Sequence, residues 1–155
     1  MNAITRSNKH LFYLFFLALV LLQSCTTVRL ISDYDEITDQ AVTEMQEKVS
    51  RFFVQLNREV GTDKARHENY VPFYDDVRTD LNSLRIRANA IDRNEIVQKQ
   101  ISNLSDMIDN TEKLHKIGFR TVNELKPLQG NFDAAFTAIV KLQLALKRGE
   151  KPNSN

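Results

Sequence analysis

The stretch that decides the fold is residues 69–91, which reads NYVPFYDDVRTDLNSLRIRANAI. Polar side chains separate apolar ones in this stretch, and Pro72 falls in its first turn, where a helix tolerates proline. The apolar residues follow the period of one buried face of an α-helix, so the stretch predicts an amphipathic helix. Their spacings are 3, 4, 3, 4 and 3: Tyr74, Val77, Leu81, Leu84, Ala88 and Ile91.

The same period appears upstream, over residues 33–60. Ser32 is the expected N-cap of this helix, acidic residues fill its first turn, and Gly61 stands where a C-terminal cap belongs. This stretch predicts a second amphipathic helix, whose apolar seam is Val42, Met45, Val49, Phe52 and Leu56.

Two further helices are predicted downstream. Asp92 and Glu95 have the spacing of a capping box that opens a helix ending at Gly118. A second capping box, Thr121 to Glu124, opens a helix that ends at Gly149. Pro127 lies inside this last stretch and predicts a kink, or a helix that begins near Pro127.

Four amphipathic helices joined by short connections predict an all-α, antiparallel up-down-up-down four-helix bundle over residues 33–149. The longest connection, 62–68, is polar, and residues 150–155 are expected to form a disordered tail. The competing arrangement is a bundle completed by a partner chain, because heptad seams also drive coiled-coil pairing.

The N-terminus has the pattern of a secretory signal peptide over residues 1–24. Arg6 and Lys9 precede an unbroken apolar run of 12 residues, 11–22, and no acidic residue lies among them. This run is shorter than the roughly 20 apolar residues that span a bilayer. A positive segment followed by a short apolar one is typical of an export signal.

The next residues, Leu22-Gln23-Ser24-Cys25, resemble the lipobox of bacterial lipoprotein precursors, although Gln23 is bulkier than usual. The resemblance implies cleavage before Cys25, a diacylglycerol on its thiol, and a lipidated tether over residues 25–32. It also implies a place in the cell envelope, and Thr26 implies the periplasmic face of the outer membrane in a double-membraned bacterium. The alternatives are an uncleaved anchor helix and an ordinary signal with a chance cysteine.

The composition of the chain limits the classes of partner that it is expected to bind. Removing residues 1–24 leaves a net charge of −1, because two basic residues and no acidic ones leave with them. A near-neutral chain lacks the basic footprint of a nucleic-acid-binding protein. Cys25 is the only cysteine, so an internal disulfide is excluded.

No catalytic, metal or cofactor constellation is predicted. Glu112-x-x-His115 has the spacing used by di-iron bundles, but such sites need a second copy of the motif. Haem ligation by Met45 and His115 is disfavoured, because their depths in the bundle differ by about 15 Å. His67 and His115 are expected to be solvated or capping residues, and an enzyme is reconsidered only if His115 is buried beside acidic groups.

The expected function is that of a non-catalytic, lipid-anchored envelope protein that binds a protein partner or itself. Its basic C-terminal residues would lie near the lipid, while aromatic residues would gather at the opposite end. We predict a partner-binding surface there; its alternative is an aromatic plug in the core. An apolar small-molecule carrier is the alternative function. The surface residues predicted are Phe53, Tyr70, Phe73 and Phe119.

Overall fold

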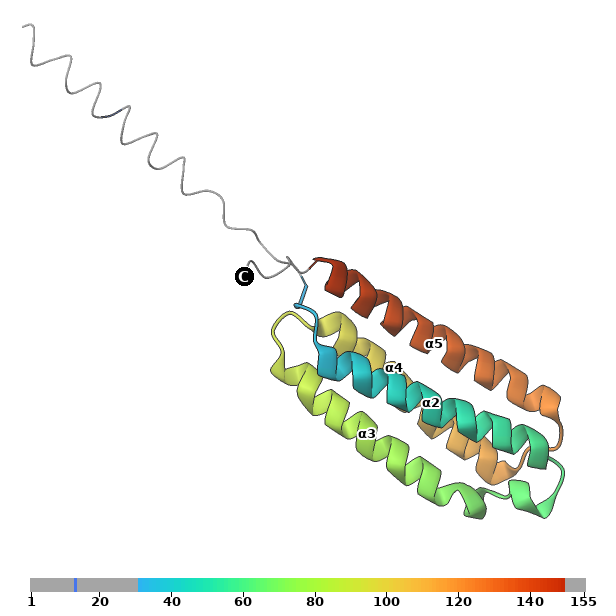
Figure 1. Cartoon of the computed structure of the whole chain (residues 1–155). Coiled ribbons are helices and arrows are strands. Elements are labelled where there is room, and N and C mark those ends of the chain that lie inside the picture. The colour runs from blue at the N-terminus through green and yellow to red at the C-terminus, as the bar shows by residue number, and fades with distance from the viewer. Residues whose placement is uncertain (1–12, 14–30, 150–155) are drawn as a thin grey trace, which may run out of the picture. The chain divides into compact units, whose positions relative to one another are not determined.

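The computed structural model describes Tyr13 and residues 31–149 of a chain that divides into two units after Leu30. Within 31–149 it contains four α-helices, two short 3₁₀ helices and no strand, so the predicted all-α four-helix bundle is confirmed (Figure 1). Apart from Tyr13, the predicted signal lies outside the described residues, as do Cys25 and the tail 150–155. The elements are α2 (Glu36–Glu59), η1 (Asp63–Ala65), η2 (His67–Tyr70), α3 (Val71–Ala90), α4 (Glu95–Ile117) and α5 (Val122–Gly149).

The four helices form a ring in which α2 and α4 each pack against both α3 and α5. Figure 1 places the α2–α3 and α4–α5 connections at one end of the bundle and the α3–α4 connection at the other. We call the first, which holds residues 60–70 and 118–121, the histidine end. The second holds residues 31–35, residues 91–94 and the last turn of α5, and we call it the Asp35 end. Among the described residues, no helix is both long and apolar enough to cross a membrane.

The apolar seams of the four helices meet in one contiguous core. Burying each large apolar side chain contributes about 1.5–3 kcal/mol relative to leaving it in water. The core therefore provides the main driving force for the arrangement of the helices. Its largest fully buried apolar members are Tyr74, Phe53, Met45, Leu56, Ile101, Leu104, Ile108, Leu125 and Ile139.

The predicted start of the first helix is wrong by three residues. The N-cap of α2 is Asp35, whose carboxylate accepts hydrogen bonds from the backbone N–H of Thr38 at 3.2 Å and from its hydroxyl at 2.5 Å. Ser32 is instead buried, and its hydroxyl donates to Oδ1 of Asn94 at 3.0 Å. The serine is thus committed to a contact 62 residues away, which local sequence cannot reveal.

The predicted capping box at Asp92 is also wrong, since α4 begins at Glu95 and its N-cap is Asn94. The Asn94 side chain makes no cap hydrogen bond; it donates to the carbonyl of Ala88 at the end of α3. At the start of α5, Glu124 does reach back, and its carboxylate accepts from the N–H of Arg120 at 3.1 Å. The helix α5 is continuous through Pro127, so a start near that proline is excluded.

Candidate functional site

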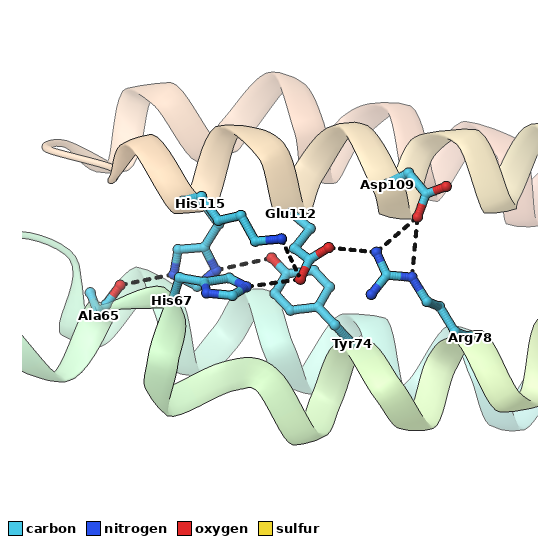
Figure 2. Close-up of polar contacts among 8 residues, drawn as sticks. Ala65, His67, Tyr74, Arg78, Asp109, Glu112 and His115 are labelled. Carbon is cyan, nitrogen blue, oxygen red and sulfur yellow. Dashed lines mark hydrogen bonds and ion pairs between the residues drawn. The ribbon is translucent and has the colours of Figure 1, made fainter.

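A cluster of polar side chains lies between α3, α4 and η2 at the histidine end (Figure 2). Its centre is Glu112, which is 9% exposed. The Glu112 carboxylate accepts hydrogen bonds from Nη2 of Arg78 at 2.5 Å and from Nε2 of His67 at 2.9 Å. Nζ of Lys116, one turn further along α4, forms an ion pair with it at 3.2 Å. Three groups from three elements therefore converge on one carboxylate.

These partners stabilise the ionised form of Glu112 despite its burial. The hydrogen bond from Arg78 is the largest cause that lowers the pKa of Glu112 to about 2, with His67 and Lys116 adding to it. Arg78 also holds Asp109 at 2.8 Å, and the two carboxylates together raise the pKa of its guanidinium. Glu112 and Arg78 therefore form an ion pair that stays charged over the physiological pH range.

His115 lies beside this network and is 1% exposed. The hydroxyl of Tyr74 approaches Nδ1 of His115 at 2.9 Å, and Nε2 lies 2.8 Å from the carbonyl oxygen of Ala65. A carbonyl only accepts, so Nε2 carries the proton; in the neutral ring Nδ1 then accepts from Tyr74. Burial lowers the pKa of His115, which favours this neutral form.

Aromatic rings enclose His115 on its other sides. The Tyr70 and Phe119 ring centroids lie 5.2 and 5.3 Å from the imidazole, and the Phe52 centroid lies 6.0 Å away. Phe52 in turn stacks on Phe73 at 4.2 Å with nearly parallel planes. The aromatic plug that we considered as the alternative to an exposed patch is therefore present.

The expectation that both histidines are solvated or capping residues is wrong. His115 is buried beside Glu112, which is the condition under which we would reconsider an enzyme. However, both ring nitrogens of His115 already have partners, and the Glu112 carboxylate is held by three cationic or hydrogen-bonding groups. These contacts hold the 60–70 connection against α3 and α4.

The predicted binding residues are mostly in the core. Phe53 is 1% exposed and packs against Phe132 of α5 at 5.7 Å, so its predicted exposure is wrong. Tyr70 is 4% exposed, and its hydroxyl donates to Glu59 at 2.6 Å. The adjacent rings of Phe52 and Phe53 are both buried, so the core at this end takes more than the single seam of α2. Phe73 and Phe119 are half-buried, and their role in binding stays a prediction.

The network was missed from sequence, although one signal pointed to it. The buried seam of α4 runs through Ile101, Leu104 and Ile108, and one further heptad from Ile108 reaches His115. A histidine in register with an apolar seam is expected to be buried and hydrogen-bonded. Its partners Tyr74 and Ala65 lie 41 and 50 residues away in the chain, and no local pattern could have named them.

A shallow hollow lies on the outer surface of the histidine end, between the two connections. Phe119 and Ala65 are the apolar residues on its wall, and Asp63 and Arg66 provide charges of both signs. Gly61 and Gly118, also on its wall, have positive φ angles of 86° and 96°, which other residues adopt only with strain. The hollow is therefore a feature that the backbone of both connections shapes.

Two other candidate sites find no support. Within residues 31–149 and Tyr13, no group of three or more His, Cys, Asp or Glu side chains is arranged to hold a metal ion. A carrier would need a cavity among the seams of α3 and α5, but these seams pack with those of α2 and α4 into a single cluster. No buried member of that cluster is more than 6% exposed, and the carrier stays an alternative prediction.

Comparison of the chain with protein-family models, with curated proteins and with solved structures finds no match. The function must therefore be argued from the residues and the geometry themselves.

Proposed function

We propose that this chain is a lipid-anchored, non-catalytic protein of the bacterial cell envelope that binds a protein partner through its histidine end. The observation that carries the anchor is Leu22-Gln23-Ser24-Cys25, which follows a basic segment and a short apolar run. One lipid chain anchors a protein only weakly, whereas two or more signals anchor it stably. The lipobox implies both a diacylglycerol and an N-acyl chain on Cys25.

The hollow between the two connections supports the binding half of the proposal. Phe119 offers a partly exposed ring there, and aromatic rings in a pocket are typical anchors of protein interfaces. His115 and His67 hold the 60–70 connection against α4, so the wall of the hollow is ordered before a partner arrives. A preordered surface loses less conformational entropy on binding.

The anchor is tested by mass spectrometry of the protein purified from bacterial membranes. We expect a mature chain that begins at residue 25 and carries the added mass of a diacylglycerol and one acyl chain. The Cys25→Ser variant should lack this mass and should move from the detergent phase to the aqueous phase on phase partitioning. A wild-type chain that retains residues 1–24 or carries no lipid would overturn the anchor.

The binding surface is tested with a photo-crosslinking amino acid introduced singly into the full chain in its native cells. We expect crosslinks of one defined mass from Thr62 and Phe119 in the hollow. Ser83, an exposed position on α3 far from this end, is the matched control and should give none. Equal crosslinking from Ser83, or none from the hollow, would overturn the proposed surface without affecting the anchor.

A further inference from the structure

Neighbouring helices of the bundle meet along four contact lines, and we call each of them by its two helices, such as the α4–α5 seam. These four seams differ in the polar side chains that cross them. Side chains cross three of them: Lys48 to Asp80 between α2 and α3, Arg78 to Glu112 between α3 and α4, and Asn57 to Gln129 between α2 and α5. Within residues 31–149, no side-chain hydrogen bond or ion pair joins α4 to α5. The α4–α5 seam is thus the one described seam without a polar tie.

A row of uncharged residues follows this seam along α4. Asp109 and Glu112 mark the flank of α4 that faces α3, because Arg78 binds both. At 100° per residue, Met107 and Leu114 lie about 140–160° from these carboxylates, on the opposite flank. The row continues at spacings of 4, 3, 4, 3 and 4: Ile96, Gln100, Asn103, Met107, Asn110 and Leu114.

A matching row follows the seam along α5. Gln129 marks the flank that faces α2, because Asn57 binds it. Asn131, two residues later, lies about 200° away and so borders α4. This row is also uncharged, at spacings of 3, 4, 3, 4 and 3: Leu128, Asn131, Ala135, Ala138, Leu142 and Ala145.

We call these two rows the uncharged face. Seven of its twelve residues are exposed, including Ile96 at 51% and Leu114 at 43%. Charged residues make up 26% of the chain, but none of these seven exposed positions carries a charge. Depletion of charge is the compositional mark of the centre of a protein interface.

We propose that the uncharged face is the contact surface between two copies of this chain related by a twofold axis. A twofold interface sets the same patch against itself, so it must tolerate self-contact. A face without charge meets its own copy without like-charge repulsion. The amides of Asn103, Asn110 and Asn131 each carry both donors and acceptors, so they can pair with identical amides.

The dimensions of the face fit a small dimer interface. A helix of 23 residues such as α4 is about 34 Å long, and two packed helices present a width of about 20 Å. Roughly 600–700 Å² of each copy, or about 1,200–1,400 Å² in total, would be covered if the exposed charged residues that border the rows, Lys99, Asp106 and Lys141, form the rim of the interface. This area is at the lower end of stable interfaces. Alanines at 135, 138 and 145 allow the backbones of the two copies to approach closely.

The inference does not rest on the histidine end or on the lipid, since neither contributes a residue to the face.

The proposed dimer is tested by sedimentation equilibrium of the purified full chain in density-matched detergent. We expect a dimer at about 100 µM chain. The decisive comparison is Ala138→Glu against Thr137→Glu. These two positions are adjacent and both exposed, but Thr137 lies on the flank that faces α2.

Ala138→Glu should weaken dimerisation at least about tenfold, because it sets two carboxylates against each other across the axis. Asn110→Glu on α4 should do the same, whereas Thr137→Glu should change the dissociation constant by less than about twofold. Circular dichroism should show unchanged thermal unfolding for all three. A monomer at 100 µM, equal effects of Ala138→Glu and Thr137→Glu, or a dimer insensitive to Ala138→Glu would overturn the proposal.

Discussion

At the Asp35 end, ionic and polar side chains hold the helices together, whereas at the histidine end aromatic rings and a buried imidazole do so. Arg87 binds Asp35 with two hydrogen bonds of 2.5 Å, and Asp35 also caps α2. At the other end, His115 is enclosed by rings and bonded to the carbonyl of Ala65. The two ends of one bundle thus rely on different physical interactions.

This difference predicts different responses to pH at the two ends. The hydrogen bonds from Arg87 are the largest cause that lowers the pKa of Asp35 to about 2. Stability from Asp35 is therefore complete above about pH 4 and is lost as the pH falls toward 2. Burial lowers the pKa of His115. Stability from its neutral form is complete above about pH 6.5, its unfolded pKa, and begins to fall as the pH drops below that value.

The largest effect is expected from the ring that organises the histidine end. Phe52→Ala removes contacts with Tyr70, Phe73 and Tyr74 and leaves a cavity, so the free energy of unfolding should fall by about 3–5 kcal/mol. Urea unfolding measures this change. Val54→Ala, at an exposed position two residues away, is the control and should cost less than about 0.5 kcal/mol. Similar losses in both variants would contradict the described packing.

A smaller effect is expected at the Asp35 end. Asp35→Ala removes the cap of α2 and the partner of Arg87, which should lower the free energy of unfolding by about 2 kcal/mol at pH 7. The difference from wild type should shrink as the pH approaches 2, where Asp35 becomes protonated. Glu36→Ala, at an exposed neighbouring position, should cost much less. A pH-independent difference would show that the ion pair contributes nothing.

The histidine end should weaken over a milder pH range. Between pH 7.5 and 5.5 the wild-type chain should lose more stability than His115→Gln, because burial lowers the pKa of His115 and the unfolded wild type therefore gains a proton at this position more readily than the folded chain. The protection of the amides of residues 61–70 against hydrogen exchange, relative to their intrinsic exchange rates, should decrease over the same range in wild type. Identical pH dependence in the two chains would mean that His115 takes up its proton equally in both states.

The smallest effect on the free energy of unfolding is expected at the hydrogen bond that joins the residues before α2 to the α3–α4 connection. Ser32→Ala removes the buried hydrogen bond to Asn94 and should lower the free energy of unfolding by about 0.5–1 kcal/mol. Ser83→Ala, at an exposed position whose hydroxyl bonds only the preceding turn of its own helix, is the control. If Ser83→Ala costs as much, the contact at Ser32 does not contribute to stability.

Much of the fold was predictable because each helix repeats its apolar residues with the helical period. Val77, Leu81 and Leu84 are buried as their spacing predicts. The caps were less predictable: Ser32, Asp33 and Asp35 are all suitable cap residues, and the choice among them depends on Arg87 of another helix. Asp92 is likewise a suitable cap residue by type, but the N-cap of α4 is Asn94.

The sequence predicted at which end of the bundle the candidate site lies, but not the contacts within it. The sequence placed aromatic residues and both histidines at one end, and the structure confirms that His67, His115 and Phe119 gather there. It could not indicate that Phe53 is buried as well as Phe52, because Phe53 lies outside the helical period of the seam and its ring packs against Phe132 of another helix.

The sequence by itself determined the number and approximate length of the helices and which face of each is apolar, and it carries the residues up to Cys25 on which the proposed lipid anchor rests. These features depend on residues within a few positions of one another, and side-chain periodicity records them directly. Only the tertiary structure decided that Glu112 is held by Arg78 and His67, that burial favours the neutral form of His115, and that the described residues of the α4–α5 seam lack polar ties. Those properties depend on residues tens of positions apart, whose distances are set by how the helices pack.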